Sequence, residues 1–148
     1  MSPLSIRPST GSAEFVALVE IWRTAVDATH AFLAEEHREE IEERLATEYL
    51  PAVELSVAVA NGVPVGFAGV AEGNLEMLFV DASRRGGGIG SALLAHTIDA
   101  HGVTKVDVNE QNPQAVGFYE HHGFVVVSRS AHDDAGRPYP LLHMRLGG

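Results

Sequence analysis

A strand, a glycine-rich turn and a helix follow one another over residues 78–98, and no other segment constrains the fold as strongly. The apolar run Leu-Phe-Val ends at Val80, and the sequence Arg-Arg-Gly-Gly-Gly-Ile-Gly then leads into an apolar helix that begins near Ser91. Glycines let a backbone approach a ligand closely, and the first N–H groups of a helix have no partner within it. Because that end of a helix also carries partial positive charge, the segment predicts a pyrophosphate site.

Two widespread phosphate-binding loops do not account for this segment. The nucleoside-triphosphate loop ends in Gly-Lys-Ser/Thr, whereas the only lysine of the chain is Lys105. The dinucleotide loop Gly-x-Gly-x-x-Gly is nearly present, but it belongs to a leading parallel strand–helix–strand unit. Here three strand-like runs precede the glycines, and the dipeptides Asn61-Gly62 and Gly73-Asn74 between them are typical of tight hairpins. We therefore expect antiparallel strands before the loop.

The hydrophobic pattern of the whole chain predicts a single mixed α/β domain over residues 1–148. Apolar residues at helical spacing indicate a helix over 13–28, and after an interruption at 29–33 an acidic helix runs on to Leu50. Further helices are expected from the glycines to about Gly102, and over 113–122 with a proline in the first turn. Strands are expected over 4–7, 54–60, 63–71, 75–80, 105–108, 125–130 and 139–146.

The formal net charge of −10 limits the possible partners. A sequence-independent grip on DNA or RNA needs a basic surface, so we expect no nucleic-acid partner. The acid is concentrated in residues 35–43. This run favours either a cationic substrate or simply a solvated helix face, in which case Ile41, Leu45 and Tyr49 point inward at four-residue spacing.

Other site classes are excluded by what the sequence lacks. Without cysteine there is no disulfide, thiolate metal site or cysteinyl intermediate, and no histidine pair has the spacing of a zinc site, so we expect no metal. No apolar run is long enough to cross a membrane, and the first residues do not have the pattern of a signal peptide. A cytoplasmic protein without a membrane partner is therefore expected.

Two motifs in sequence order resemble the GCN5-related N-acetyltransferases (GNAT). Arg85-x-x-Gly88-x-Gly90 after Leu-Phe-Val-Asp is similar to the acetyl-coenzyme A loop of that family. The run Val-Asn-Glu-Gln-Asn-Pro-Gln-Ala-Val-Gly-Phe-Tyr at 108–119, followed by His-Gly-Phe, is similar to its second signature. Segments 27–33 and 133–142 resemble the bacterial YjaB-type subgroup in particular. The resemblance implies a mixed, mostly antiparallel sheet of about six or seven strands flanked by about four helices.

The resemblance also implies a reaction. The protein would transfer an acetyl group from acetyl-coenzyme A to a primary amine, by direct attack in a ternary complex, and the subgroup favours a protein lysine as the acceptor. A small-molecule amine remains an alternative acceptor, and a non-catalytic acyl-coenzyme A-binding regulatory module remains an alternative function. The sequence leaves open whether the protein is a homodimer.

By the same resemblance the strand and the loop hold the cofactor. The strand would pair with the pantetheine arm, and the Val80 N–H would face the thioester carbonyl, where a backbone donor stabilises developing negative charge. The glycine-loop N–H groups would bind the pyrophosphate, with charge-assisted help from the arginines. The expected cofactor-binding residues are Leu78, Phe79, Val80, Arg84, Arg85, Gly86, Gly87, Gly88, Ile89, Gly90, Ser91 and Asn112.

Tyr119 is the expected general acid. The family places a tyrosine near the coenzyme A sulfur one turn after the asparagine, and a phenol is a plausible proton donor to a thiolate. One of two adjacent aromatic residues on a helix usually enters the core, and we expect Phe118 to take that position. Asn112 itself could equally be an ordinary helix start.

The proton acceptor is less constrained, because a lysine-like amine of pKa ~10.4 must lose a proton before it attacks. Glu76 lies on the strand that leads to the cofactor site and, by the period-two rule, shares the facing of Leu78 and Val80; it is either the base or an ordinary solvent-facing carboxylate. His30 and Phe32 match subgroup residues over the acceptor site and are the expected substrate-binding pair. His30 titrates in a useful range, but a histidine at a helix break can also be a cap or packed residue.

Overall fold

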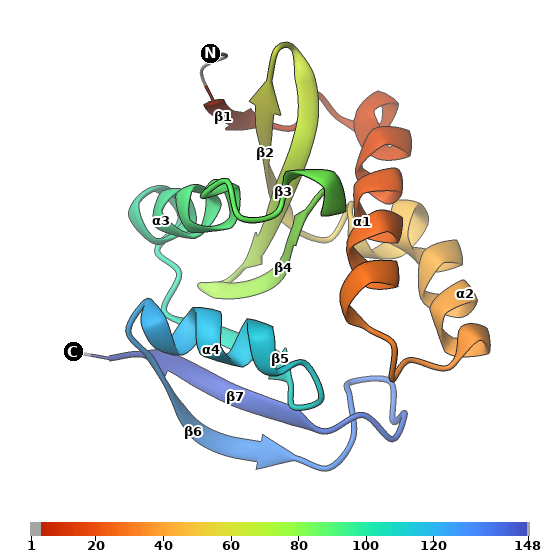
Figure 1. Ribbon diagram of the computed structural model, residues 1–148, viewed down its shortest axis with the longest axis vertical. Coiled ribbons are helices and arrows are strands. Elements are labelled where there is room, and N and C mark those ends of the chain that lie inside the picture. Colours follow the sequence, from red (N-terminus) through yellow and green to blue (C-terminus); the bar gives the residue numbers. More distant parts are fainter. Residues whose placement is uncertain (1–3, 148) are drawn as a thin grey trace.

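Seven strands form one sheet in the order β1-β2-β3-β4-β5-β7-β6 in the computed structural model, which describes residues 4–147 (Figure 1). The strands are β1 Leu4–Pro8, β2 Glu54–Ala60, β3 Val63–Ala71, β4 Asn74–Val80, β5 Lys105–Asn109, β6 Phe124–Ser130 and β7 Leu141–Leu146. The helices are α1 Phe15–Thr29, α2 Glu35–Arg44, α3 Ile89–His101 and α4 Pro113–His121. The predicted mixed sheet with flanking helices is confirmed.

The strands before the glycines form an antiparallel meander, as the hairpin dipeptides indicate. Asn61 and Gly62 both take positive φ, 54° and 75°, which is the backbone of a two-residue hairpin turn. The second turn is centred one residue earlier than predicted, on Glu72-Gly73, with Ala71 pairing with Asn74. Glu72 takes the left-handed conformation there, at φ 50°, because the pairing of the strands requires it.

One parallel contact interrupts this antiparallel sheet, and it is short. β4 and β5 pair only through Asn74 with Lys105 and Leu75 with Val106. From there the two strands separate, and β5 continues to pair with β7. The rest of β4 up to Val80 therefore has no strand partner on its β5 side in the described chain, which leaves an opening in the middle of the sheet.

Helices cover both faces of the sheet and form two separate cores. α3 and α4 pack on one face around Leu93, Leu94 and Phe124, each at most 1% exposed. α1 and the segment after α2 pack on the other face around Leu18 and Phe67, both fully buried. Figure 1 shows α1 and α2 together on one side of the opening, and α3 and α4 on the other. The opening thus lies where the two layers meet.

The acidic helix runs nearly to its predicted end at Leu50, but it changes from α to π geometry on the way. α2 stops at Arg44, and Leu45–Tyr49 forms a π turn in which the Leu50 N–H donates to the Leu45 carbonyl at 2.8 Å. A π turn places residues five apart on nearly the same side, and both Leu45 and Leu50 are buried at 1% and 0% exposure. The inward facing predicted for Ile41, Leu45 and Tyr49 is confirmed, since all three pack in the α1 core.

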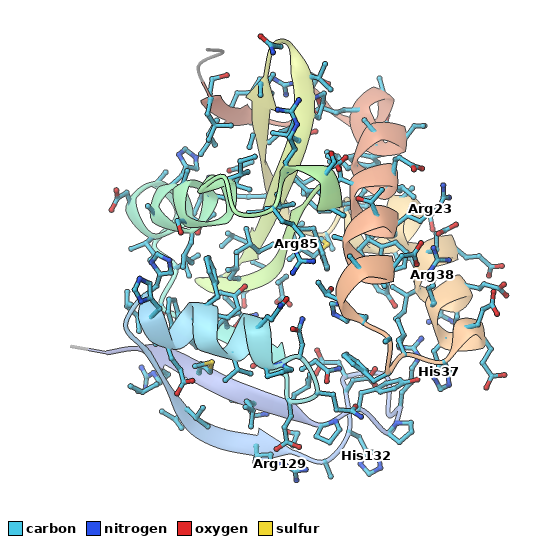
Figure 2. The ribbon with its side chains drawn as sticks, viewed as in Figure 1. Arg23, His37, Arg38, Arg85, Arg129 and His132 are labelled. Atoms are coloured by element: carbon cyan, nitrogen blue, oxygen red, sulfur yellow. The ribbon has the colours of Figure 1, made fainter. Side chains whose placement is uncertain are left out.

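The carboxylates of the acidic segment are partly paired rather than simply solvated. Glu42 forms an ion pair with Arg23 at 3.0 Å, and Glu40 forms one with Arg137, which lies in the connection between β6 and β7. Figure 2 shows Arg23 and Arg38 on the surface of α1 and α2. Among residues 4–147, no helix has both the length and the apolar character needed to span a bilayer.

Candidate active site

The glycine loop surrounds an open space at the start of α3. Gly86 and Gly88 have φ of 83° and 79°, and a Cβ atom on either would have no neighbour within 4 Å. Gly88 is the N-cap of α3, so the free N–H groups of the helix begin beside it. Residues with side chains rarely adopt this left-handed backbone, which explains the glycines. The loop therefore has the geometry of an anion cradle.

A hollow of about 480 Å³ connects this cradle to the opening in the sheet. We call it the glycine-loop hollow. It is lined by Leu78, Val80, Arg84, Arg85, Gly86, Gly88, Ile89, Gly90, Ser91, Ala115, Phe118 and Tyr119. The structure thus brings together nine of the twelve predicted cofactor-binding residues and the predicted acid; Phe79, Gly87 and Asn112 lie outside its lining.

Two contacts that the sequence analysis missed hold the loop in place. A Cβ on Gly66 of β3 would lie 3.1 Å from Ile89 Cγ2 and 3.2 Å from Leu93 Cδ1, so a side chain there would crowd α3 where it packs on the sheet. The Ala82 N–H donates to Thr24 Oγ1 of α1 at 3.2 Å and fixes the link before the glycines. A glycine within a strand pattern could have indicated that a helix packs closely there, but nothing in the sequence around Thr24 indicates its bond to Ala82.

The unpaired edge of β4 presents its backbone to the opening. The Asp81 N–H donates to the Val65 carbonyl of β3 at 2.9 Å. Successive N–H groups of a strand point to opposite sides, so the Val80 N–H points away from β3 and toward the opening. The side chains alternate as well: Leu78 and Val80 pack with the α3 core, whereas Phe79 packs with the α1 core, 5.7 Å from the Phe67 ring.

Tyr119 is the buried member of the aromatic pair, which corrects the expectation for Phe118. Tyr119 is 8% exposed and stacks edge-on against Phe124 at 5.7 Å, while Phe118 is only half-buried. The α4 face that turns toward the sheet carries Tyr119, and Phe118 covers the side of the hollow at Gly90. Burial raises the pKa of the Tyr119 phenol, which therefore keeps its proton at neutral pH.

Tyr119 lines the glycine-loop hollow, and its phenol oxygen is not completely enclosed. It makes no hydrogen bond within residues 4–147, and no side-chain oxygen or nitrogen of the described residues is both fully buried and without a partner. A tyrosine hydroxyl in a core normally has a partner. An accessible, unpaired hydroxyl at the end of a buried ring suits a group that contacts a ligand.

A second, smaller hollow of about 190 Å³ lies on the α1 side of the opening. We call it the His30 hollow. The two hollows share four lining residues and therefore meet at the end of β4. The residues lining the second are Ala25, Thr29, His30, Leu78, Phe79, Val80, Arg85, Asn112, Gln114 and Ala115.

His30 sits directly after α1 and is mostly shielded from solvent. Its Nδ1 is 2.6 Å from Thr29 Oγ1, and its ring is 5.2 Å from that of Phe32. Burial lowers the pKa of His30 below its usual value of 6.5. Phe32 does not line the His30 hollow; it lies between His30 and Tyr139, whose ring is 6.1 Å away.

Tyr139 connects the segment after α1 to the connection between β6 and β7. Its hydroxyl accepts the Ala34 N–H at 3.0 Å and is 2.5 Å from Nδ1 of His37. Figure 2 shows His37 at the end of α2 that faces the β6–β7 connection. Pro138 and Pro140 flank Tyr139 and lack N–H donors, so β7 begins at Leu141 instead of the predicted 139.

Asn112 and Arg85 border the opening from two sides. Asn112 is the N-cap of α4 and accepts the Ala115 N–H at 3.2 Å, so it is a helix start that also lines the His30 hollow. Arg85 reaches across the opening and donates to Gln114 Oε1 at 2.6 Å. Figure 2 shows Arg85 between α1 and α4.

Glu76 does not share the facing of Leu78. Gly69 pairs with Met77 and Val70 with Leu75, so Glu76 is the extra residue of a β-bulge and the period-two alternation fails there. Its exposed side chain borders two other hollows, one beside Met77 and one of about 660 Å³ on the open face of β5 and β7. The expectation that Glu76 shares the facing of Leu78 and Val80 is wrong for this geometric reason.

No three histidine or acidic side chains within residues 4–147 are arranged to hold a metal ion. The donors gathered around the opening are instead backbone N–H groups, two arginines and a phenol. This set suits a phosphorylated, extended ligand with a reactive carbonyl at its end.

Comparison with known proteins agrees with this geometry. Residues 16–146 match the acetyltransferase (GNAT) domain family. The chain is 49% identical over 129 residues to the peptidyl-lysine N-acetyltransferase YjaB of Salmonella typhimurium, covering 86% of this chain and 88% of that protein. The solution structure of apo-form YjaB from Escherichia coli has a TM-score of 0.89 at 43% identity, with 99% of each chain covered.

A more distant structure shares the fold. The PaiA N-acetyltransferase of Thermoplasma acidophilum, in complex with coenzyme A, has a TM-score of 0.74 at 18% identity and covers 97% of this chain and 99% of its own. The glycine cradle, the unpaired β4 edge and the two matched motifs fit acetyl-coenzyme A in this chain. The chain therefore belongs to the GNAT family of acetyl-coenzyme A-dependent N-acetyltransferases.

Proposed function

We propose that this protein acetylates lysine side chains of other proteins, by direct attack of the amine on the thioester of acetyl-coenzyme A. The observation that carries the proposal is that two hollows meet at the end of β4, one built for a phosphorylated cofactor and one beside His30. The name of the Salmonella typhimurium relative, a peptidyl-lysine N-acetyltransferase, supports the choice of acceptor. A cytoplasmic location goes with it, because acetyl-coenzyme A and such acceptors occur there.

The cofactor would be held largely by backbone groups. Acetyl-coenzyme A supplies the activated acetyl group; the free N–H groups from Gly86 to Ser91 bind its pyrophosphate, and Arg84 and Arg85 add charge-assisted contacts. Leu78 and Val80 turn their N–H groups toward the opening and extend the sheet along the pantetheine arm. The Val80 N–H then stabilises the negative charge that develops on the carbonyl oxygen.

Tyr119 supplies the proton for the departing sulfur. Its phenol is neutral at working pH because burial raises the pKa, and the residue lines the glycine-loop hollow. Replacing the phenol removes the donor but leaves the cofactor cradle intact. Removing a general acid typically costs two to four powers of ten in rate, so Tyr119→Phe is expected to lower kcat about 100-fold with little change in KM for acetyl-coenzyme A.

The acidic surface favours cationic acceptors. The net charge of −10 and the acidic run at 35–43, which begins five residues after His30, attract a lysine-bearing surface, and such steering weakens with salt. Arg137 pairs with one of these acids, Glu40, so part of the negative charge is already compensated. The attraction is therefore long-range and moderate.

The test is an acetyl-transfer assay with three acceptor classes: lysine-containing proteins, free polyamines and free amino acids. Thiol release gives the rate, and mass spectrometry locates the acetyl group. We expect lysine acetylation well above the rate without enzyme, and its loss in Tyr119→Phe. Tyr49→Phe is the matched control, because Tyr49 lies half-buried in the α1 core, away from both hollows.

Two outcomes would contradict the proposal. Turnover only with the small amines would make the acceptor a small molecule. Binding of acetyl-coenzyme A without turnover of any acceptor would make the protein a regulatory binding module.

A further inference from the structure

We propose that His30 is the base that accepts the proton of the acceptor amine, and that Thr29 is a positioning residue that fixes the His30 tautomer able to do so. The inference deepens the proposed function and rests on it. Three observations support it. Thr29 makes two hydrogen bonds that bear on the His30 ring, His30 lines the hollow that meets the cofactor site, and Glu76 lies outside that site at a β-bulge.

The hydrogen bonds of Thr29 determine which nitrogen of His30 carries the proton. The Thr29 hydroxyl has a single hydrogen, and it donates that hydrogen to the Ala25 carbonyl at 2.8 Å. Toward His30 Nδ1, 2.6 Å away, the same oxygen can then only accept. The neutral imidazole therefore carries its hydrogen on Nδ1, assigned here from the hydrogen-bond network, and leaves a free lone pair on Nε2.

The backbone holds the His30 ring at a fixed place. The His30 N–H donates to the Val26 carbonyl at 2.8 Å, which ends α1, and the His30 carbonyl accepts the Leu33 N–H at 3.0 Å. Phe32 covers one side of the ring at 5.2 Å. With Nδ1 engaged by Thr29, Nε2 is the nitrogen left for a ligand in the hollow that His30 shares with Val80.

The surroundings keep this imidazole neutral. β4 contributes only apolar side chains to the hollow, and α4 contributes the neutral amides of Asn112 and Gln114. The one charged residue among the lining residues is Arg85, whose guanidinium is bound to the Gln114 oxygen. Burial alone lowers the pKa of His30, so the ring is unprotonated at neutral pH and can accept a proton.

Glu76, the other candidate from the sequence, is placed less well. It protrudes at the β4 bulge with an exposed carboxylate, and it borders neither the His30 hollow nor the glycine-loop hollow. A base must lie within hydrogen-bond reach of the proton it takes, directly or through one water. His30 lines the hollow that reaches the end of β4, where the acceptor amine would lie, whereas Glu76 lines neither hollow.

The proton balance is complete with the residues present. His30 Nε2 takes one proton from the lysine ammonium, and the nitrogen lone pair then forms the C–N bond. The C–S bond breaks with its electron pair on sulfur, and Tyr119 donates its proton there. The second proton lost by the nitrogen restores the phenol, and His30 returns its own proton to solvent. One acetyl amide, one thiol and one free proton result.

The test measures kcat/KM for a lysine acceptor against pH in the intact protein. His30→Gln is expected to lower kcat on the order of 100-fold while acetyl-coenzyme A binding is retained. In the wild type, kcat/KM should fall at acidic pH because a protonated His30 cannot accept the proton, and this fall should be absent in His30→Gln. Thr29→Val is expected to lose about 10-fold, and Thr29→Ser, which keeps the hydroxyl, to recover most of that loss. His132→Gln, in the exposed β6–β7 connection, is the matched histidine control.

A second readout does not depend on activity. The ¹⁵N shifts of the His30 ring distinguish the two tautomers, and we expect hydrogen on Nδ1 in the wild type and a mixture in Thr29→Val. Hydrogen on Nε2 in the wild type would overturn the role of Thr29. Wild-type kcat in His30→Gln, or loss of the fall in kcat/KM at acidic pH in Glu76→Gln alone, would overturn the role of His30. Absence of any lysine acetylation by the wild type would contradict the proposed function instead.

Discussion

The two hollows that meet at the end of β4 are built in different ways. The glycine-loop hollow comes mainly from one continuous segment, residues 78–91, closed by α4. The His30 hollow instead joins residues of α1, of β4 and of the start of α4. The segment that follows His30 is held by bonds of Tyr139 to Ala34 and to His37, which are 105 and 102 residues away in sequence. The cofactor side is thus specified locally, whereas the acceptor side is specified by tertiary contacts that can change without disturbing the cofactor.

The sharpest way to break the cofactor side alone is Gly88→Ala. A Cβ at this left-handed N-cap places a methyl group in the space beside the first free N–H groups of α3. Losing two charge-assisted hydrogen bonds of about 1.5 kcal/mol each corresponds to a dissociation constant about 100-fold higher for acetyl-coenzyme A. Calorimetric titration with acetyl-coenzyme A measures this dissociation constant.

Gly62→Ala is the control for backbone strain. Gly62 has nearly the same φ, 75° against 79°, and also has open space at its Cβ, but it lies in the β2–β3 hairpin. Both variants should lose similar stability, on the order of 1 kcal/mol, and only Gly88→Ala should lose affinity. Equal affinities of the two variants for acetyl-coenzyme A would show that the glycine loop does not bind the cofactor.

The acceptor side is broken by Tyr139→Phe. The change removes the oxygen that binds the Ala34 N–H and His37, at a cost of about 1–2 kcal/mol, and frees the segment between α1 and α2. We expect KM for a lysine acceptor to rise about 10-fold while the dissociation constant for acetyl-coenzyme A stays the same. Steady-state kinetics with each substrate varied in turn separates the two.

The outcome that would contradict this division is a parallel loss of cofactor affinity in Tyr139→Phe. Tyr49→Phe removes the same hydroxyl from the α1 core and should change neither constant.

The smallest expected effect is on stability in acid. Burial holds the pKa of His30 below its usual 6.5, so below that pH the unfolded chain binds more protons than the folded one. The free energy of unfolding therefore falls as the pH drops below about 6.5 and is unaffected by His30 above it. Urea unfolding of wild type and His30→Gln, at about pH 5.5 and about pH 7.5, isolates this contribution from the carboxylates. An equal acid loss in both proteins would contradict it.

The same division explains how far the sequence alone could predict the site. Gly86, Gly88 and the β4 residues were predictable because a phosphate loop needs a strand, glycines and a helix start in one continuous segment. The first hairpin was predictable because Asn61-Gly62 supplies the required positive φ, whereas the second turn falls one residue earlier than its dipeptide suggests. These features depend on local backbone chemistry, which neighbouring residues determine.

Other features depend on packing that local patterns do not encode. The bulge at Glu76 reverses the facing that strict alternation predicts, because Leu75 is needed in the α3 core. The burial of Tyr119 rather than Phe118 follows from the rotation of α4 against the sheet. The Tyr139 hydroxyl bonds and the link from Thr24 to Ala82 connect segments that only the folded chain brings together.

The most direct test of the account is amide chemical-shift mapping of the ¹⁵N-labelled protein during titration with acetyl-coenzyme A. We expect the largest changes on Leu78–Val80 and on Gly86–Ser91, with little change at Glu72, Lys105 or Arg145 around the open face of β5 and β7. Changes centred on that open face, or no saturable change at the glycine loop, would contradict the assignment of the cofactor site from which every other step is argued.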